Sequence, residues 1–162
     1  MNDDVKKYWG EFWQGNEPHP IDAWQFGVIP DELAEMVIAG KKTTTTSTYS
    51  SYEARNEPMP HIGKCSVILD SNDKPMAIIE VVDVSVIPMN EVSMEHRANE
   101  GDCGQHGELW WDIHEEYFTN ILAERGEAFS KSMLVVCERF KLINSNMSQL
   151  SKRVYSPKDE VE

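Results

Sequence analysis

Gly40-Lys41-Lys42-Thr43-Thr44-Thr45-Thr46-Ser47 is the segment around which the expected fold is organised, because cations and hydroxyls concentrate there beside a flexible glycine. Four consecutive threonines lose side-chain freedom in a helix and favour an extended strand. Because side chains alternate along a strand, two faces are predicted, one with Lys42, Thr44 and Thr46 and the other with Thr43, Thr45 and Ser47. This segment is therefore the best candidate for a functional site.

The residues on both sides of this segment predict an α+β domain. Helical spacing of apolar residues predicts helices over residues 5–13, 30–39, 89–99 and 108–124. Apolar runs bounded by turn residues predict strands over residues 23–26, 63–69, 76–86 and 132–143, the second and third of which form a hairpin. Residues 50–62 fit neither period and predict a long surface loop. We expect a small, mostly antiparallel sheet that is flanked by helices and can close into a barrel.

Length and composition predict one compact domain. The 162 residues suffice for a sizeable core, and the five tryptophans and 40% hydrophobic content exclude a wholly disordered chain. We expect residues 1–20 to form an amphipathic helix and a linker that pack on the domain. Residues 21–143 should form the domain itself, and residues 144–162 a polar, poorly ordered tail.

The sequence favours a cytoplasmic location. No apolar run approaches the roughly 20 residues that a membrane helix needs, and the start of the chain lacks the basic and apolar regions of a secretion signal. We therefore expect no contact with membranes. The cysteines are odd in number and far apart, which indicates reduced thiols instead of disulfides at Cys65, Cys103 and Cys137.

The formal net charge of −13 limits the partners of the chain. A protein that grips a long nucleic acid normally presents a basic surface to the phosphates, so long duplex DNA is not an expected partner. The residues from Lys41 to Lys74 nevertheless hold five basic side chains against four acids. This local balance leaves room for a mildly basic pocket for a small ligand.

Lys42, Thr45 and Glu80 are the candidate catalytic residues. A hydroxyl attacks a carbonyl only when a base removes its proton, and a partly desolvated amine can act as that base. A nearby carboxylate can orient the amine or deliver a proton. The alternative is structural, because threonine runs are common in edge strands and lysine is usually solvated.

A zinc site is a weaker alternative. Cys103-x-x-His106 and His114 could supply three ligands, but no second pair of cysteines or histidines completes the set. The same residues also fit a turn whose acids cap helices. Because P-loop and dinucleotide fingerprints are missing as well, we expect neither a metal nor a cofactor.

Aromatic side chains offer surfaces on which a base could stack. Trp24, Phe26, Trp110 and Trp111 are more often core residues in such patterns, whereas Tyr49 and Tyr52 follow the threonine segment directly.

Six motifs occur in an order that resembles the ASCH domain (activating signal cointegrator homology), in its bacterial single-domain form. The resemblance covers roughly Trp24 to Ile143 and is carried by Gly40–Thr45, Glu57-Pro58-Met59-Pro60 with Gly63, Ile78-Ile79-Glu80-Val81, Pro88, Glu100-Gly101-Asp102, and Trp111-x-x-His114-x-x-x-Phe118. It implies a PUA-like fold, which is a small β-barrel flanked by helices.

The resemblance also implies a function. ASCH domains are expected to recognise RNA or a modified nucleoside in a cleft beside the Gly-x-Lys-x-x-Thr motif, and one branch hydrolyses the acetyl amide of N4-acetylcytidine. Carried over by motif, Lys42 is the base, Thr45 the nucleophile and Glu80 the supporting carboxylate. Ligand contacts are expected from Gly40, Lys41, Ser47, Tyr49, Asp102, Trp111 and His114.

One departure from the family pattern leaves the activity open. The motif commonly continues to an arginine where this chain has Ser47, which cannot form a two-pronged bond. The chain is therefore expected to bind a nucleoside or short RNA, with an amidohydrolase, a ribonuclease and a non-catalytic RNA-binding module as the alternatives. A homodimer formed through the aromatic N-terminal helix is a further alternative.

Overall fold

The computed structural model describes residues 1–154, and the chain divides into two compact units. Unit 1 contains Met1–Ile38, Cys65–Glu80 and the chain from Leu142, and unit 2 contains Ala39–Lys64 and Val81–Lys141. The domain bounds expected from the sequence stay a prediction. The strands β4 (Pro75–Pro88) and β5 (Leu134–Ser145) each contribute residues to both units.

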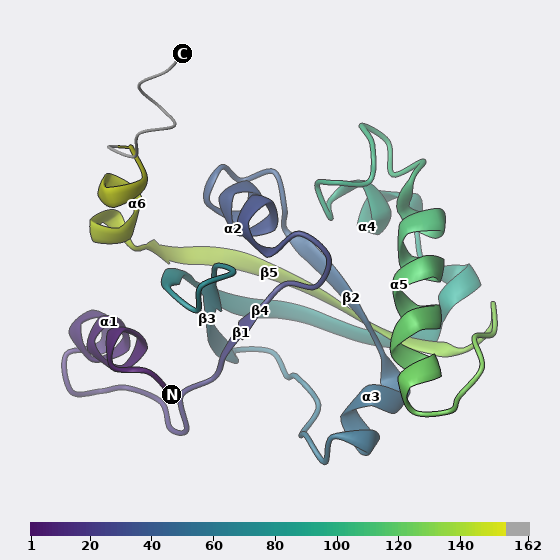
Figure 1. Cartoon of the computed structure of the whole chain (residues 1–162), viewed down its shortest axis with the longest axis horizontal. Coiled ribbons are helices and arrows are strands. Elements are labelled where there is room, and N and C mark those ends of the chain that lie inside the picture. The colour runs from purple at the N-terminus through teal and green to yellow at the C-terminus, as the bar shows by residue number, and fades with distance from the viewer. Residues whose placement is uncertain (155–162) are drawn as a thin grey trace. The chain divides into compact units, whose positions relative to one another are not determined.

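Five strands form a mostly antiparallel sheet with the order β1-β3-β4-β5-β2 (Figure 1). β3 (Cys65–Leu69) and β4 form the predicted antiparallel hairpin, and β2 (Thr44–Thr48) pairs antiparallel with β5. β1 (Ala23–Gln25), at one end of this order, runs parallel to its neighbour, β3. The sheet and its helices confirm the predicted α+β class.

Unit 1 contains the helices α1 (Asp3–Trp13), α2 (Pro30–Ile38) and α6 (Met147–Val154). Asn2 caps the start of α1, because its side chain accepts a hydrogen bond from the Val5 amide. The apolar side of α1 packs into the core of this unit, which contains Val5, Tyr8, Trp9, Val67, Leu69 and Ile78.

The poorly ordered tail expected from residue 144 is corrected up to Val154. β5 continues to Ser145 and α6 follows it. The polar residues here have partners, since Tyr8 donates to the Asn144 side chain (2.6 Å) and Asn146 donates from its backbone and its side chain to Met76 and Pro75. Residues 155–162 lie outside the described part of the chain.

Unit 2 contains β2, the helices α3 (Tyr49–Ala54), α4 (Met94–Ala98) and α5 (Trp110–Glu124), and the single turn η1 (Met89–Glu91). The predicted loop over residues 50–62 is wrong in its first part, because α3 follows β2 directly. Figure 1 shows α4 beside the first turn of α5 and α3 beside its end. The core of this unit consists of Met89, Val92, Cys103, Trp110, Phe118, Val135 and Cys137.

The predicted alternation along the threonine segment is confirmed. Lys42, Thr44, Thr46 and Thr48 are buried, whereas Thr43, Thr45 and Ser47 are half-buried. On α5, the buried residues are Trp110, His114, Phe118 and Leu122. Within residues 1–154 no helix combines the length and the apolar character needed to cross a membrane.

Candidate functional site

Glu100 is the centre of a buried polar network in unit 2. It stands two residues after the end of α4, and its side chain is surrounded by Lys42 and by residues from β2, α4 and α5. The residue is 3% exposed, so its carboxylate depends on protein donors instead of water. These donors come from Lys42, Thr46, Trp110 and His114.

Lys42 supplies the positive charge of the network. Its Nζ lies 3.4 Å from Glu100 Oε1 and donates to the carbonyl oxygens of Thr44 (2.7 Å) and Glu100 (3.3 Å). Lys42 is only 2% exposed. Three oxygen acceptors around one nitrogen match the three donors of a protonated amine.

Thr46 connects His96 to the carboxylate. The Thr46 hydroxyl donates to Glu100 Oε2 (2.7 Å), so it must accept at its second contact, with His96 Nε2 (2.8 Å). The proton of the His96 ring therefore lies on Nε2 in this arrangement. His96 is held from a second side, because its carbonyl accepts from the Thr44 hydroxyl (2.8 Å).

Trp110 and His114 approach the same carboxylate from α5. The indole N–H of Trp110 donates to Glu100 Oε2 at 2.5 Å, and His114 Nε2 lies 3.2 Å from that oxygen. The two rings are stacked with centroids 4.4 Å apart, and His114 Nδ1 lies 2.8 Å from the Trp110 carbonyl oxygen. The spacing of four residues places both side chains on the inner side of α5.

The network changes the protonation of its members. Burial raises the pKa of Glu100, but the charge of Lys42 and the donors His114 and Thr46 oppose this and lower the pKa to about 2. Glu100 is therefore ionised at neutral pH. Burial lowers the pKa of His96, an effect that the charge of Lys42 strengthens and that of Glu100 opposes. The result is a fixed carboxylate that orients an ammonium and two imidazoles.

The three residues predicted to be catalytic lie in different surroundings. Lys42 belongs to the network, while Thr45 is half-buried on the other face of β2, where it is paired with Glu138 of β5. Glu80 is half-buried in the part of β4 that belongs to unit 1, opposite Cys65. The carboxylate that contacts Lys42 is Glu100, and the assignment of catalytic roles to Lys42, Thr45 and Glu80 stays a prediction.

Among the residues predicted to contact a ligand, His114 belongs to the network. Trp111, the next residue after Trp110, is half-buried. The Ser47 hydroxyl is hydrogen-bonded to Tyr52 (2.9 Å), and Asp102 accepts from the Cys103 thiol. The others lie nearer the surface: Lys41, Gly40 with a φ of +78°, and Tyr49, which is 41% exposed.

The alternative zinc ligands are not brought together. Cys103 is buried and His106 is exposed, while His114 contacts Glu100. Within residues 1–154 no group of three His, Cys, Asp or Glu side chains is placed to hold a metal ion. Burial raises the pKa of the Cys103 thiol and raises that of Cys137 to about 12, which makes both thiols poor nucleophiles.

The roles of Glu100, Thr46, His96 and Trp110 were not predicted from the sequence. A signal for Glu100 was present, since it stands in one of the six family motifs, and His96 precedes it by one helical turn. The predicted face of Lys42, Thr44 and Thr46 also identified the side of β2 on which the network forms. The partner residues on that side could not be inferred from spacing along the chain.

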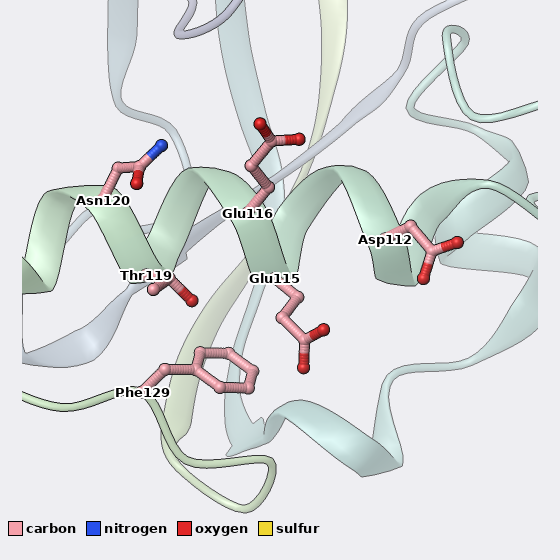
Figure 2. Close-up of a pocket in the computed structure, with 6 residues that line it drawn as sticks. All are labelled: Asp112, Glu115, Glu116, Thr119, Asn120 and Phe129. Carbon is pink, nitrogen blue, oxygen red and sulfur yellow. The ribbon is translucent and has the colours of Figure 1, made fainter.

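A separate hollow of about 500 Å³ lies along the outer side of α5 (Figure 2). Its lining contains three carboxylates and consists of Asp112, Glu115, Glu116, Thr119, Asn120 and Phe129. None of these residues belongs to the Glu100 network, and the carboxylates would repel an anionic ligand. We therefore place the candidate site at the network and not in this hollow.

Comparisons with known proteins agree with the resemblance found in the sequence. A model of the ASCH domain family matches residues 22–144. A crystal structure of a protein from Enterococcus faecalis V583, described under family DUF984, is similar with a TM-score of 0.84 and 28% identity, covering 96% of this chain and 98% of that chain. Among curated proteins the comparison finds no match.

An ASCH domain from Lactobacillus crispatus JV V101 is also similar, with a TM-score of 0.78 and 26% identity over 88% of this chain and 95% of that chain. These neighbours confirm the predicted PUA-like α+β fold. Since the family model covers most of the sequence, the chain belongs to the ASCH domain family.

Proposed function

We propose that this ASCH domain recognises a modified nucleoside, free or within a short RNA, and hydrolyses an acyl amide on its base, such as that of N4-acetylcytidine. The observation that carries the proposal is the burial of Lys42 and Glu100 together, with a 3.4 Å separation, beside two histidines. Burying charges is costly for stability, so such clusters are more frequent at functional sites than elsewhere. Membership of the ASCH family supports the choice of ligand.

The proposed reaction consumes one water and releases a carboxylate and an amine. The Thr45 hydroxyl oxygen bonds to the acyl carbon, the C–N bond breaks, and the proton from the hydroxyl passes to the leaving amine. Water then releases the acyl group and restores the hydroxyl. We propose Glu100 as the supporting carboxylate, since it contacts Lys42. Thr45 lies on the other face of β2, so its role as the nucleophile rests on the family motif alone, as does the role of Glu80.

Lys42 could act in the reaction either as a base or as a positive charge. The family resemblance makes it a base, which requires the neutral amine. The three acceptors around Nζ fit the ammonium, which would instead stabilise the negative oxygen of the intermediate. Lys42→Arg, which keeps the positive charge but cannot act as a base, should be inactive if Lys42 is the base and should keep part of the activity if the ammonium acts.

The test is an incubation of the purified protein with N4-acetylcytidine, with cytidine followed by chromatography. Lys42→Ala and Thr45→Val should each lower kcat/KM by about a hundredfold or more. Glu100→Gln and Glu80→Gln identify the carboxylate, and Lys131→Ala serves as an exposed control in the same unit. Circular dichroism verifies that each variant folds. No turnover by the wild type would exclude the hydrolase.

A non-catalytic RNA-binding module is the second candidate. It is favoured by the low exposure of Lys42 and Glu100, 2% and 3%, because a network so enclosed can act as a rigid support instead of reacting. RNA affinity should then fall with added salt and not depend on Thr45. Cleavage of RNA on a gel, lost in Lys42→Ala, would identify the third candidate, a ribonuclease. The cytoplasmic location and a homodimer stay predictions from the sequence.

A further inference from the structure

Arg97 on α4 is held in place by two tryptophans. Its guanidinium carbon lies 4.7 Å from the ring centroid of Trp110 and 5.7 Å from that of Trp111. Its Nε donates to the carbonyl oxygen of Val92 (3.0 Å), a residue that precedes α4. A guanidinium stacked on indole rings keeps its plane and its direction. The residue as a whole is half-buried.

Within residues 1–154, the terminal nitrogens of Arg97 make no hydrogen bond. In Arg125, which lies in the same unit, all three guanidinium nitrogens have partners. Its Nε pairs with Glu127 (2.9 Å), and its two Nη groups donate to Ser51 and Ser50. For Arg97, the part of the chain that the structure describes provides one hydrogen bond, at Nε, and no ion pair. Two NH₂ groups therefore remain for a ligand.

That Arg97 has no acidic partner within residues 1–154 is unexpected in a chain with 28 acids and 15 basic residues. Three acids close to Arg97 in sequence have other partners. Glu100 is bound within the network, Glu108 accepts from the His106 amide (2.9 Å), and Asp102 accepts from the Cys103 thiol (3.3 Å). Arg97 is thus a positive charge that the surrounding acids leave available for an external anion.

The loop before α5 is fitted closely to Arg97. Gly107 has a φ of +79°, and a Cβ added there would lie 2.7 Å from the Ala98 nitrogen and 2.8 Å from the Arg97 Cβ. Only glycine fits this approach of the loop to α4. Trp110 then joins Arg97 to the network, because its ring faces Arg97 while its N–H binds Glu100.

We propose that Arg97 binds the phosphate of a nucleotide, so that the ligand of this domain is a nucleoside phosphate or a phosphate-linked RNA residue instead of a free nucleoside. Two NH₂ groups in one plane match two oxygens of a phosphate. The proposal rests on the proposed function for the nucleoside part of the ligand, and phosphate recognition by Arg97 can be measured separately from hydrolysis.

The experiment is isothermal titration calorimetry of the full chain with cytidine, cytidine 5′-monophosphate and inorganic phosphate. The monophosphate should bind about tenfold to a hundredfold more tightly than cytidine. Arg97→Gln should remove this advantage and leave the cytidine affinity unchanged. Arg97→Lys should keep part of it, because the charge remains without the planar fork. Arg55→Gln, an exposed arginine of unit 2, should have no effect.

Two outcomes would overturn the inference: equal affinities for cytidine and its monophosphate, or an equal loss for both ligands in Arg97→Gln. Failure to bind any of the three probes overturns it as well. The proposed hydrolase can fail on its own, because binding of the monophosphate through Arg97 without turnover leaves this inference standing. Thermal unfolding of Arg97→Gln verifies that the loss does not come from misfolding.

Discussion

The Nζ of Lys42 lies 3.4 Å from Oε1 of Glu100, and the two residues are 2% and 3% exposed. They are 58 positions apart in the chain, and the pair joins the segment before β2 to the segment after α4. In a low-dielectric interior each charge depends on the other, so the loss of one partner leaves an uncompensated charge.

The first prediction concerns the stability of this pair. Lys42→Met should lower the free energy of unfolding by about 3 to 5 kcal/mol, because it leaves the Glu100 charge buried without its partner. The double variant Lys42→Met/Glu100→Gln should lose at least about 1 kcal/mol less than the sum of the single variants. Urea titration measures these values. Strict additivity would mean that the two charges do not support each other.

The second prediction is a loss of stability in acid. The folded pKa of Glu100, about 2, is below its ordinary value of 4.5, so its contribution is present above pH 4.5 and is lost as the pH falls toward 2. The lowered pKa of His96 adds a loss that begins below its ordinary value of 6.5, where the unfolded chain takes up the proton more readily.

Urea titrations across this pH range provide the measurement. Glu100→Gln should flatten the dependence between pH 4.5 and 2, and His96→Gln should flatten the part that begins at pH 6.5. Glu116→Gln, an exposed carboxyl on α5, is the control. A wild-type slope retained in Glu100→Gln would contradict the assignment.

The third prediction separates the indole N–H of Trp110 from its ring. Trp110→Phe keeps an aromatic ring beside Arg97 and His114 but removes a donor from Glu100. A hydrogen bond to a buried charge is worth about 1.5 to 3 kcal/mol, so the free energy of unfolding should fall by that amount. Trp111→Phe, which removes no such bond, should cost less. Equal losses in thermal or urea unfolding would assign the effect to packing alone.

The fourth prediction uses glycines with positive φ. Gly107→Ala should lower the free energy of unfolding by about 2 kcal/mol or more, since strain adds to a clash with Ala98 and Arg97. Gly126→Ala has a φ of +71° and nothing within 4 Å of the added Cβ, so it should cost only about 1 kcal/mol. A smaller loss at Gly107 than at Gly126 would mean that the loop moves away from α4 at little cost.

Part of the candidate site was predictable because it depends on local geometry. The alternation of the threonine segment follows from the period of a strand, and it placed Lys42 with Thr44 and Thr46 before any partner was known. Because side chains alternate along a strand, the same period places Thr45 on the opposite face from Lys42. The partner of Lys42 was not predictable, because the carboxylate that reaches it stands after another helix and several acids were available.

The corrected elements have similar causes. Residues 144–154 are polar, and their order depends on partners far away in the chain, such as Tyr8 for Asn144 and Pro75 for Asn146. The helix α3 is short and lacks a strong apolar period, so the preceding strand and the contacts of Arg125 with Ser50 and Ser51 decide its place.

The sequence by itself determined the α+β class, the main strands and helices, the buried side of the threonine segment and the family. These depend on residue periods and motif order, which act over a few positions at a time. Only the tertiary structure decided that Glu100 is the carboxylate at Lys42 and that Arg97 lies over two tryptophans. Such pairings depend on how β2, α4 and α5 pack. Packing brings together residues that are far apart in the chain, and their spacing in the sequence does not indicate that they are in contact.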